Sequence, residues 1–318
     1  MSTERFLVTG AFGCLGTWTV KLLIAAGAEV TAFDLASDDH RWTHVMSSSE
    51  SGAAEVVLGD VTDQQLLRTV MDDRKITNVV HLAGLQFPAC QADPVRGAQV
   101  NVLGTLSVFG AAAASGSVRG MSYASSASVY GPPEEYSNRM VDDDSAAAPR
   151  SFYGAYKVAN ELTAKAFQYD HRFGSVGLRP TIVFGPGRDT GASSGISIAM
   201  VEAAMGRPYE IPFSGSLALS FAPDAAHDFI AAARREGREA SVHNISARTY
   251  SMDDIVSTID SYAMTPGLVT CRAVQIPGAV EAVADTPTDF LLHQDELTAL
   301  ADAVRTTMTG SPTARTSH

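Results

Sequence analysis

The chain has 318 residues, 45% hydrophobic and 18% charged, a balance typical of a globular enzyme with a large core. Asp and Glu number 35 against 23 Lys and Arg, so the formal net charge is −12 and no dense basic face for nucleic acid is visible. The apolar run VKLLIAAGAEV (20–30) is too short to span a bilayer. We therefore expect neither nucleic acid nor a membrane as a partner.

The cysteines give an expectation about location. Cys14, Cys90 and Cys271 are widely spaced and form no C-x-x-C or Cys/His ligand pattern, so we expect no metal site. The N-terminal residues MSTER lead directly into an apolar run and leave no room for a signal peptide. A reducing, cytoplasmic location is expected.

Short apolar runs alternate with amphipathic patterns through the first half. Strands are predicted at 6–10, 29–34, 55–60, 78–84, 120–126 and 175–185, and helices at 14–27, 63–73, within 95–115 and from about 151. Strands that are apolar throughout and separated by helices favour a parallel sheet covered on both faces. The expected fold class is therefore α/β with a doubly wound parallel sheet.

A glycine-rich loop joins the first strand to the first helix. TGAFGCLG places Gly10, Gly13 and Gly16 where a tight turn, a close approach by pyrophosphate and close helix–strand packing are needed. The pyrophosphate would lie on the exposed N–H groups of the helix N-terminus. Asp34 ends the second strand, where a carboxylate binds the adenosine ribose and favours NAD. NADP is the less favoured cofactor, retained as an alternative because Arg41 could bind its 2′-phosphate.

The pattern changes after residue 185. GPGRDTGASSG (185–195) predicts a mobile loop, and shorter helical patterns follow it. We expect an NAD-binding Rossmann domain at 1–189, a smaller mixed α/β substrate-binding lobe at 190–308 and a disordered tail at 309–318.

Several ordered motifs resemble those of the extended short-chain dehydrogenase/reductase superfamily, the NAD-dependent epimerase/dehydratase family. The resemblance covers about residues 5–185 and rests on the glycine loop, GDVTD, HLAG, NVLGT, SSASVYG, the Y-x-x-x-K of Tyr153 and Lys157, and LRPTIVFGPG. It implies a Rossmann-like sheet with a smaller C-terminal lobe, NAD as cofactor and a homodimer. The residues it places at the cofactor are Gly10, Phe12, Gly13, Cys14, Leu15, Gly16, Asp34, Asp60, Val61, Leu82, Ala83, Gly84, Asn101, Tyr153, Lys157, Pro180, Ile182 and Val183.

The expected catalytic residues are Ser126, Tyr153 and Lys157. Residues four apart on a helix share a face, so Tyr153 and Lys157 can reach one cofactor, whereas Tyr156 points away and is expected to pack. A phenol has a pKa of ~10, and a lysine ammonium with a positive nicotinamide ring would favour the phenolate. The resemblance assigns Ser126 to the substrate oxygen, with Ser125 as the neighbouring alternative.

Several residues differ from the motifs of known family members, and these differences narrow the range of expected reactions. Family 4,6-dehydratases carry an Asp-Glu pair where Ala127 and Ser128 stand. Many family epimerases bind the diphosphate with an asparagine at the Ile182 position and an arginine shortly before Asp224; here the first is apolar and the second is absent. We expect NAD-dependent oxidation of a secondary alcohol on a sugar, sugar acid or polyol. The alternative is a (nucleotide-)sugar epimerase that retains NAD, and a non-catalytic dinucleotide sensor is a third hypothesis.

Substrate contacts are expected in two loops and at the strand ends. LQFPACQADP (85–94) should flank the pocket, while an arginine in the loop after GPG is either an anion partner or a solvated side chain. Cys90 has the alternative of a small buried residue, and His81 is expected to be structural. The candidate substrate residues are Gln86, Cys90, Ser125, Ser126, Thr181 and Arg188.

Overall fold

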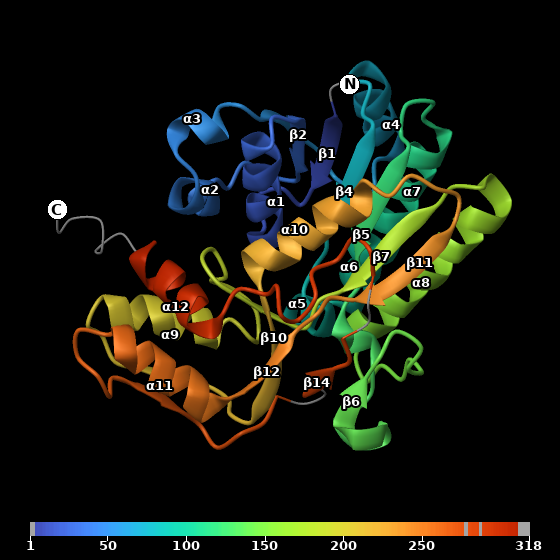
Figure 1. Cartoon of the computed structure of the whole chain (residues 1–318). Helices are drawn as coiled ribbons and strands as arrows, with labels where there is room; N and C mark the ends of the chain where they lie inside the picture. Colours follow the sequence, from blue (N-terminus) through green and yellow to red (C-terminus); the bar gives the residue numbers. More distant parts are fainter. Residues whose placement is uncertain (1–3, 277–278, 286–287, 311–318) are drawn as a thin grey trace.

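The computed structural model describes residues 4–276, 279–285 and 288–310 (Figure 1). Its main sheet has the strand order β11-β7-β5-β4-β1-β2-β3, and all neighbours in it are parallel. The strands are β1 (Arg5–Thr9), β2 (Glu29–Asp34), β3 (Glu55–Leu58), β4 (Asn78–His81), β5 (Gly120–Ala124), β7 (Ser175–Arg179) and β11 (Ala240–Asn244). The predicted doubly wound parallel sheet is confirmed.

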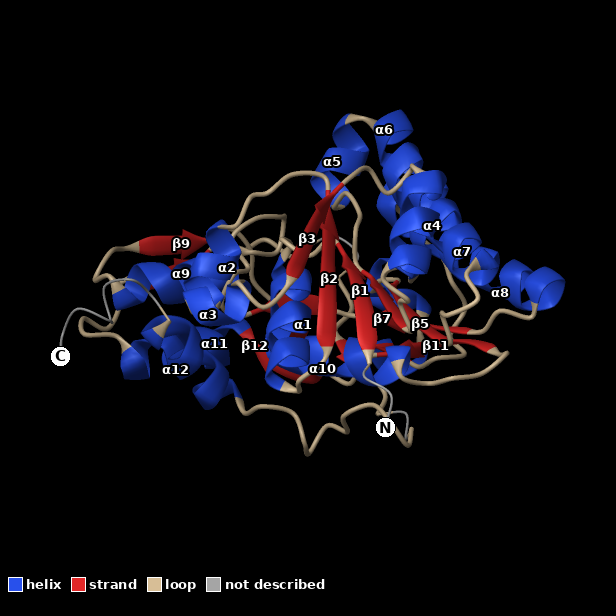
Figure 2. Ribbon diagram, turned by 90° about the horizontal axis from the view of Figure 1, so that it is seen from above, coloured by secondary structure: helices blue, strands red, loops and turns tan. Residues whose placement is uncertain are grey.

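Helices cover both faces of this sheet (Figure 2). One face carries α1 (Cys14–Ala25) and α10 (Ala222–Ala233), and the other carries α4 (Gln64–Asp73), α7 (Gly104–Ala114) and α8 (Phe152–His171). Separate apolar clusters fill the two layers. Asp63 caps α4 and Ser151 caps α8 by accepting a backbone N–H, so local sequence fixes where these helices begin.

Short elements lie between the strands and the longer helices. They are α2 (His40–Val45), α3 (Ser48–Ser51), α5 (Phe87–Ala92), α6 (Pro94–Ala98), the π-helix η1 (Gln99–Leu103), the 3-10 turns η2 (Ala127–Val129), η3 (Pro133–Glu135) and η4 (Ser137–Arg139), and β6 (Met140–Val141). The stretch Pro94–Ala114 is long and apolar enough to cross a membrane by length and composition, a test that core helices also pass. It packs against α4 and α8.

A smaller lobe lies beyond the carboxyl ends of the main strands (Figure 1). It has a three-stranded sheet, β12-β10-β8, and a two-stranded sheet, β13-β9, while β14 pairs with β6. The lobe elements are β8 (Ile182–Phe184), α9 (Gly195–Ala204), β9 (Tyr209–Ile211), β10 (Ser216–Phe221), β12 (Arg248–Ser251), α11 (Met252–Tyr262), β13 (Val269–Cys271), β14 (Ala282–Val283) and α12 (Leu300–Thr309).

Two expectations about organisation need correction. The stretch 175–185 is two strands in different sheets, because Pro180 lacks the N–H that would continue the ladder after Arg179. Beyond residue 189, α10 and β11 return to the main sheet, so the predicted boundary does not match the spatial division. Of the predicted tail 309–318, Thr309 ends α12 and residues 311–318 lie outside the described part.

Candidate active site

A cavity of about 750 Å³ lies along the carboxyl ends of β1, β2, β4 and β5 and reaches the smaller lobe. In open parallel sheets this edge is where ligands bind. Every residue that the sequence placed at the cofactor lines the cavity: Gly10, Phe12, Gly13, Cys14, Leu15, Gly16, Asp34, Asp60, Val61, Leu82, Ala83, Gly84, Asn101, Tyr153, Lys157, Pro180, Ile182 and Val183.

The glycine loop fits a dinucleotide. Gly10 has a φ of +71°, and a Cβ added there would lie 2.7 Å from the backbone nitrogen of Ala83. A Cβ on Gly16 would lie 2.0 Å from the carbonyl oxygen of Gly10. The N-cap of α1, Gly13, has no side chain to cap the helix, so the first N–H groups of α1 remain available to a phosphate.

The acidic end of β2 is held in place by the backbone. Asp34 accepts hydrogen bonds from the amides of Phe12 (2.9 Å) and Leu35 (2.7 Å). The Arg41 guanidinium donates to Asp189 (2.6 Å) and to the carbonyl of Phe12 (3.0 Å). A carboxylate therefore lies where a 2′-phosphate would bind, and the neighbouring arginine is already paired, which fits NAD better than NADP.

Helix α8 approaches the loop after β5 closely because a glycine stands at the contact. Ser151 caps α8 by accepting from the amide of Gly154 (3.0 Å). A Cβ on Gly154 would lie 2.1 Å from the carbonyl oxygen of Ser128, so only glycine lets the helix start this close. This approach places the Tyr153 phenol in the same cavity as the Ser126 side chain, near enough for Ser126 to affect the pKa of the phenol.

Burial and nearby groups shift the pKa values of Lys157 and Tyr153. Lys157 donates from Nζ to the carbonyl of Ala124 (2.7 Å), and Nζ lies 5.5 Å from the centre of the Tyr153 ring. Burial lowers the pKa of Lys157 to about 8. Desolvation in the cavity raises the pKa of Tyr153, and the nearby Ser126 side chain and the charge of Arg188 only partly offset this rise.

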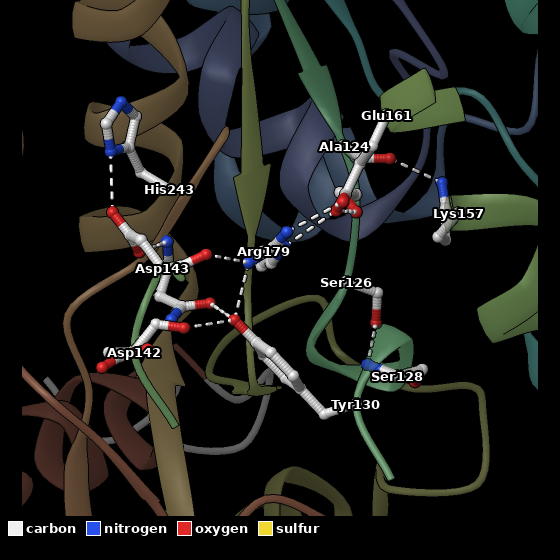
Figure 3. A network of polar contacts seen from close by, with 12 residues as sticks. Ala124, Ser126, Ser128, Tyr130, Asp142, Asp143, Lys157, Glu161, Arg179 and His243 are labelled. Carbon is white, nitrogen blue, oxygen red and sulfur yellow. Dashed lines mark hydrogen bonds and ion pairs between the residues drawn. The ribbon is translucent and has the colours of Figure 1, made fainter. Parts of the chain in front are cut away.

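The contacts of Ser125 and Tyr156 bear on two alternatives that the sequence left open. The Ser125 hydroxyl donates to Glu161 (2.5 Å), whose carboxylate receives two 2.8 Å bonds from Arg179, so this serine is tied to a buried pair. Figure 3 shows the pair and its polar neighbours, with Ser126 outside it. Tyr156 donates to the carbonyl of Pro94 (2.7 Å) and does not line the cavity, which confirms its packing role.

The histidine of the HLAG motif is structural, as predicted. His81 is 3% exposed and hydrogen-bonds through its two ring nitrogens to Thr9 (2.7 Å) and Thr105 (3.1 Å). Burial lowers the pKa of His81 to about 3, so the ring is neutral at physiological pH. Within residues 4–276, 279–285 and 288–310 no group of three or more His, Cys, Asp or Glu side chains could hold a metal ion.

The structure brings most of the predicted substrate residues together. Cys90 is the exception, because it is fully buried and does not line the cavity. Its Sγ accepts a hydrogen bond from the side-chain amide of Asn101 (3.3 Å). The sequence predicted Arg188 from the 185–195 loop but not the other wall residues of this loop and of the smaller lobe, which carry no motif: Ala192, Ser193, Ile276, Ala279 and Val280. The predicted residues that do line the cavity are Gln86, Ser125, Ser126, Thr181 and Arg188.

The fold and the site define a dinucleotide-dependent enzyme of the short-chain dehydrogenase/reductase type. A profile of the NAD dependent epimerase/dehydratase family matches residues 6–249. The chain belongs to this family, and its cofactor is NAD.

Similarity to individual proteins points to sugar epimerases. The chain is 31% identical over 214 residues to a UDP-glucose 4-epimerase of Mycolicibacterium smegmatis, covering 67% of each chain. It is 29% identical to one from Azospirillum brasilense, covering 64% of this chain and 56% of the relative. The structure of MoeE5 in complex with UDP-glucose and NAD superposes with a TM-score of 0.77 at 25% identity, covering 98% of this chain and 99% of that one.

Proposed function

We propose that the protein oxidises a secondary hydroxyl of a carbohydrate with NAD and then reduces the product again on the other face, as an epimerase that retains its cofactor. The observation that carries the proposal is that Ser126, Tyr153 and Lys157 line one cavity, with Nζ of Lys157 5.5 Å from the centre of the Tyr153 ring. The two UDP-glucose 4-epimerase relatives support epimerisation over net oxidation.

In the proposed mechanism Tyr153 moves the proton. Its phenolate oxygen takes the proton of the substrate hydroxyl as the carbonyl forms, and returns it when the carbonyl is reduced. Ser126 donates a hydrogen bond to the same substrate oxygen and orients it. Lys157 supplies positive charge beneath the phenol and a donor for the cofactor ribose. NAD held by the glycine loop and Asp34 would supply the hydride acceptor and donor, and its oxidised ring would add positive charge that favours phenolate.

A net dehydrogenase is the second candidate, and the substrate side of the cavity favours it. Ile182 lines the cavity with an apolar side chain, and β10 has the sequence SLALSF without an arginine. Asp224 is occupied as well, since it accepts from the backbone and hydroxyl of Thr298 (2.8 Å each). Neutralising a diphosphate needs cationic donors, which these positions lack. A sugar, sugar acid or polyol would suit such a surface.

The two candidates differ in what becomes of the cofactor. An epimerase forms a stereoisomer and no net NADH, and it co-purifies with NAD. A dehydrogenase forms NADH stoichiometrically. We therefore expect at least one member of a panel of sugars, sugar acids and nucleotide sugars to be isomerised without NADH. Stoichiometric NADH from any panel member would establish the dehydrogenase, and NAD binding without any turnover would favour the sensor hypothesis.

We also propose that the protein is a cytoplasmic homodimer. All three cysteines are free, which fits a reducing compartment. The helices α6, α7 and α8 and the π-helix η1 expose several large apolar side chains: Val95, Leu103, Leu106, Phe152 and Leu162. Such side chains on adjacent helices are typical of a surface that pairs with another copy. Sedimentation of the wild type and of Leu162→Glu tests this, with a monomeric wild type contradicting it.

A further inference from the structure

We propose that Arg188 forms a carboxylate-binding subsite beside Tyr153, so that the substrate is an acidic sugar or a related hydroxy acid. The inference rests on the proposed oxidation of a hydroxyl by Tyr153. It holds whether the oxidised intermediate is released or reduced again, because it concerns only how the substrate is held.

Arg188 has an unused donor inside the cavity. Its Nε is buried and has no hydrogen-bond partner among the described residues, and its Nη2 makes only a 3.3 Å contact with Ser193. A buried guanidinium N–H without an acceptor is costly, so the position favours an anionic ligand. Nε and Nη2 together form the planar fork that binds a carboxylate through two parallel hydrogen bonds.

The other cationic side chains of the cavity are already paired within the described chain. Lys157 donates to the Ala124 carbonyl (2.7 Å). Arg41 binds Asp189 and the backbone, and Arg96 contacts Asp60 (3.4 Å) at the adenosine end. One free fork suits one carboxylate better than the two charges of a diphosphate.

The surroundings of Arg188 form a built site. Gly191 has a φ of +104°, and a Cβ there would lie 2.1 Å from Oε1 of Gln86 and 3.0 Å from Nη2 of Arg188. Glycine thus lets the loop carrying Arg188 close onto the segment after β4. The Gln86 amide and the Ser193 hydroxyl add neutral donors at the cavity wall.

The position relative to the reacting group supports a substrate contact. Arg188 lines the same cavity as Ser126 and Tyr153, and its charge lowers the pKa of Tyr153. Burial raises the pKa of Cys14 in the glycine loop to about 11, and the charge of Arg188 partly offsets this rise, so Arg188 also lies near the glycine loop. The pyrophosphate of NAD is therefore the competing anion, and the experiment separates the two.

The test measures binding to the NAD-loaded protein by calorimetry. D-Glucuronate, D-galacturonate and D-gluconate are compared with D-glucose, D-galactose, D-sorbitol and UDP-glucose. We expect at least one acid to bind about tenfold more tightly than its neutral counterpart, the effect of a charge-assisted hydrogen bond. Arg188→Gln should abolish this preference, and Arg188→Lys should keep part of it. Arg119→Gln, which removes an exposed charge outside the cavity, is the matched control.

Three results would overturn the proposal. The first is equal binding of acids and neutral sugars. The second is a loss of NAD affinity in Arg188→Gln with unchanged acid binding, which would assign the arginine to the pyrophosphate. The third is preferred binding of UDP-glucose that does not depend on Arg188. Failure of the proposed function looks different: Tyr153→Phe would then keep turnover while the acid preference still depends on Arg188.

Discussion

The two halves of the cavity are built in different ways. The cofactor half comes largely from one segment of the chain, residues 10–101, and presents backbone N–H groups and glycines. The substrate half is assembled from separate segments around Gln86, Ser126, Arg188 and Ile276, and it presents side chains. Backbone recognition is tied to the fold, whereas a wall of side chains can change with the substrate.

The largest effect is expected in the cofactor half. Gly16→Ala places a Cβ 2.0 Å from the carbonyl of Gly10, so the glycine loop must move and NAD binding should be lost in a calorimetric titration. Gly116→Ala, where a Cβ has open space, is the control and should bind NAD normally. Undiminished NAD affinity in Gly16→Ala would show that the cofactor does not bind at this loop.

The junction between the halves is expected to be nearly as sensitive. Gly154→Ala forces α8 away from Ser128 and displaces Tyr153 from Ser126, and a misplacement of ~1 Å can reduce kcat by about 10²-fold. NAD affinity should change little, which separates the effect from a lost cofactor. Ala155→Gly, at an exposed neighbour, controls for helix propensity. An unchanged kcat in Gly154→Ala would contradict the contact with the serine loop.

A smaller effect is expected at the ribose end of the cofactor. Asp34→Ser removes the carboxylate and should weaken NAD binding about tenfold, the usual cost of a charged hydrogen bond. NADP should gain little, because Arg41 stays paired with Asp189. Asp39→Ser, outside the cavity, should leave both affinities unchanged. A switch to tight NADP binding would mean that Arg41 is free to leave its partner.

The smallest effect is expected at His40, which connects the segment after β2 to Asp189 in the 185–195 loop. Hydrogen bonds to Asp38 and Asp189 raise the pKa of His40, so the folded state binds its proton more strongly than the unfolded state. The stabilisation is therefore complete below a pH of about 6.5 and is lost as pH rises through the raised pKa. His40 is half exposed, so His40→Ala should cost under about 1 kcal/mol in urea unfolding. An equal cost at all pH values would contradict the ionic link.

The cofactor half was predictable because its causes are local in sequence. The tight turn at Gly10, the start of α1 at Cys14 and the acid at the end of β2 all follow from short patterns with fixed spacing. The Tyr153–Lys157 pair is equally local, since one helical turn joins the two residues.

The substrate half depends on contacts between distant segments. The choice between Ser125 and Ser126 is made by Glu161, which lies on another element and leaves no sign near the serines. Ile276 reaches the cavity from the smaller lobe without any motif. Residues 175–185 looked like one apolar strand because periodicity cannot show that Pro180 divides them between two sheets.

The central claim is that Tyr153 performs reversible proton transfer during oxidation of a substrate hydroxyl by bound NAD. The most direct measurement is turnover of a sugar isomerised by the wild type, repeated with Tyr153→Phe at equal NAD occupancy. We expect the variant to bind NAD normally and kcat to fall by about 10²–10⁴-fold, the usual contribution of a general acid–base group. Turnover equal to that of the wild type would contradict it.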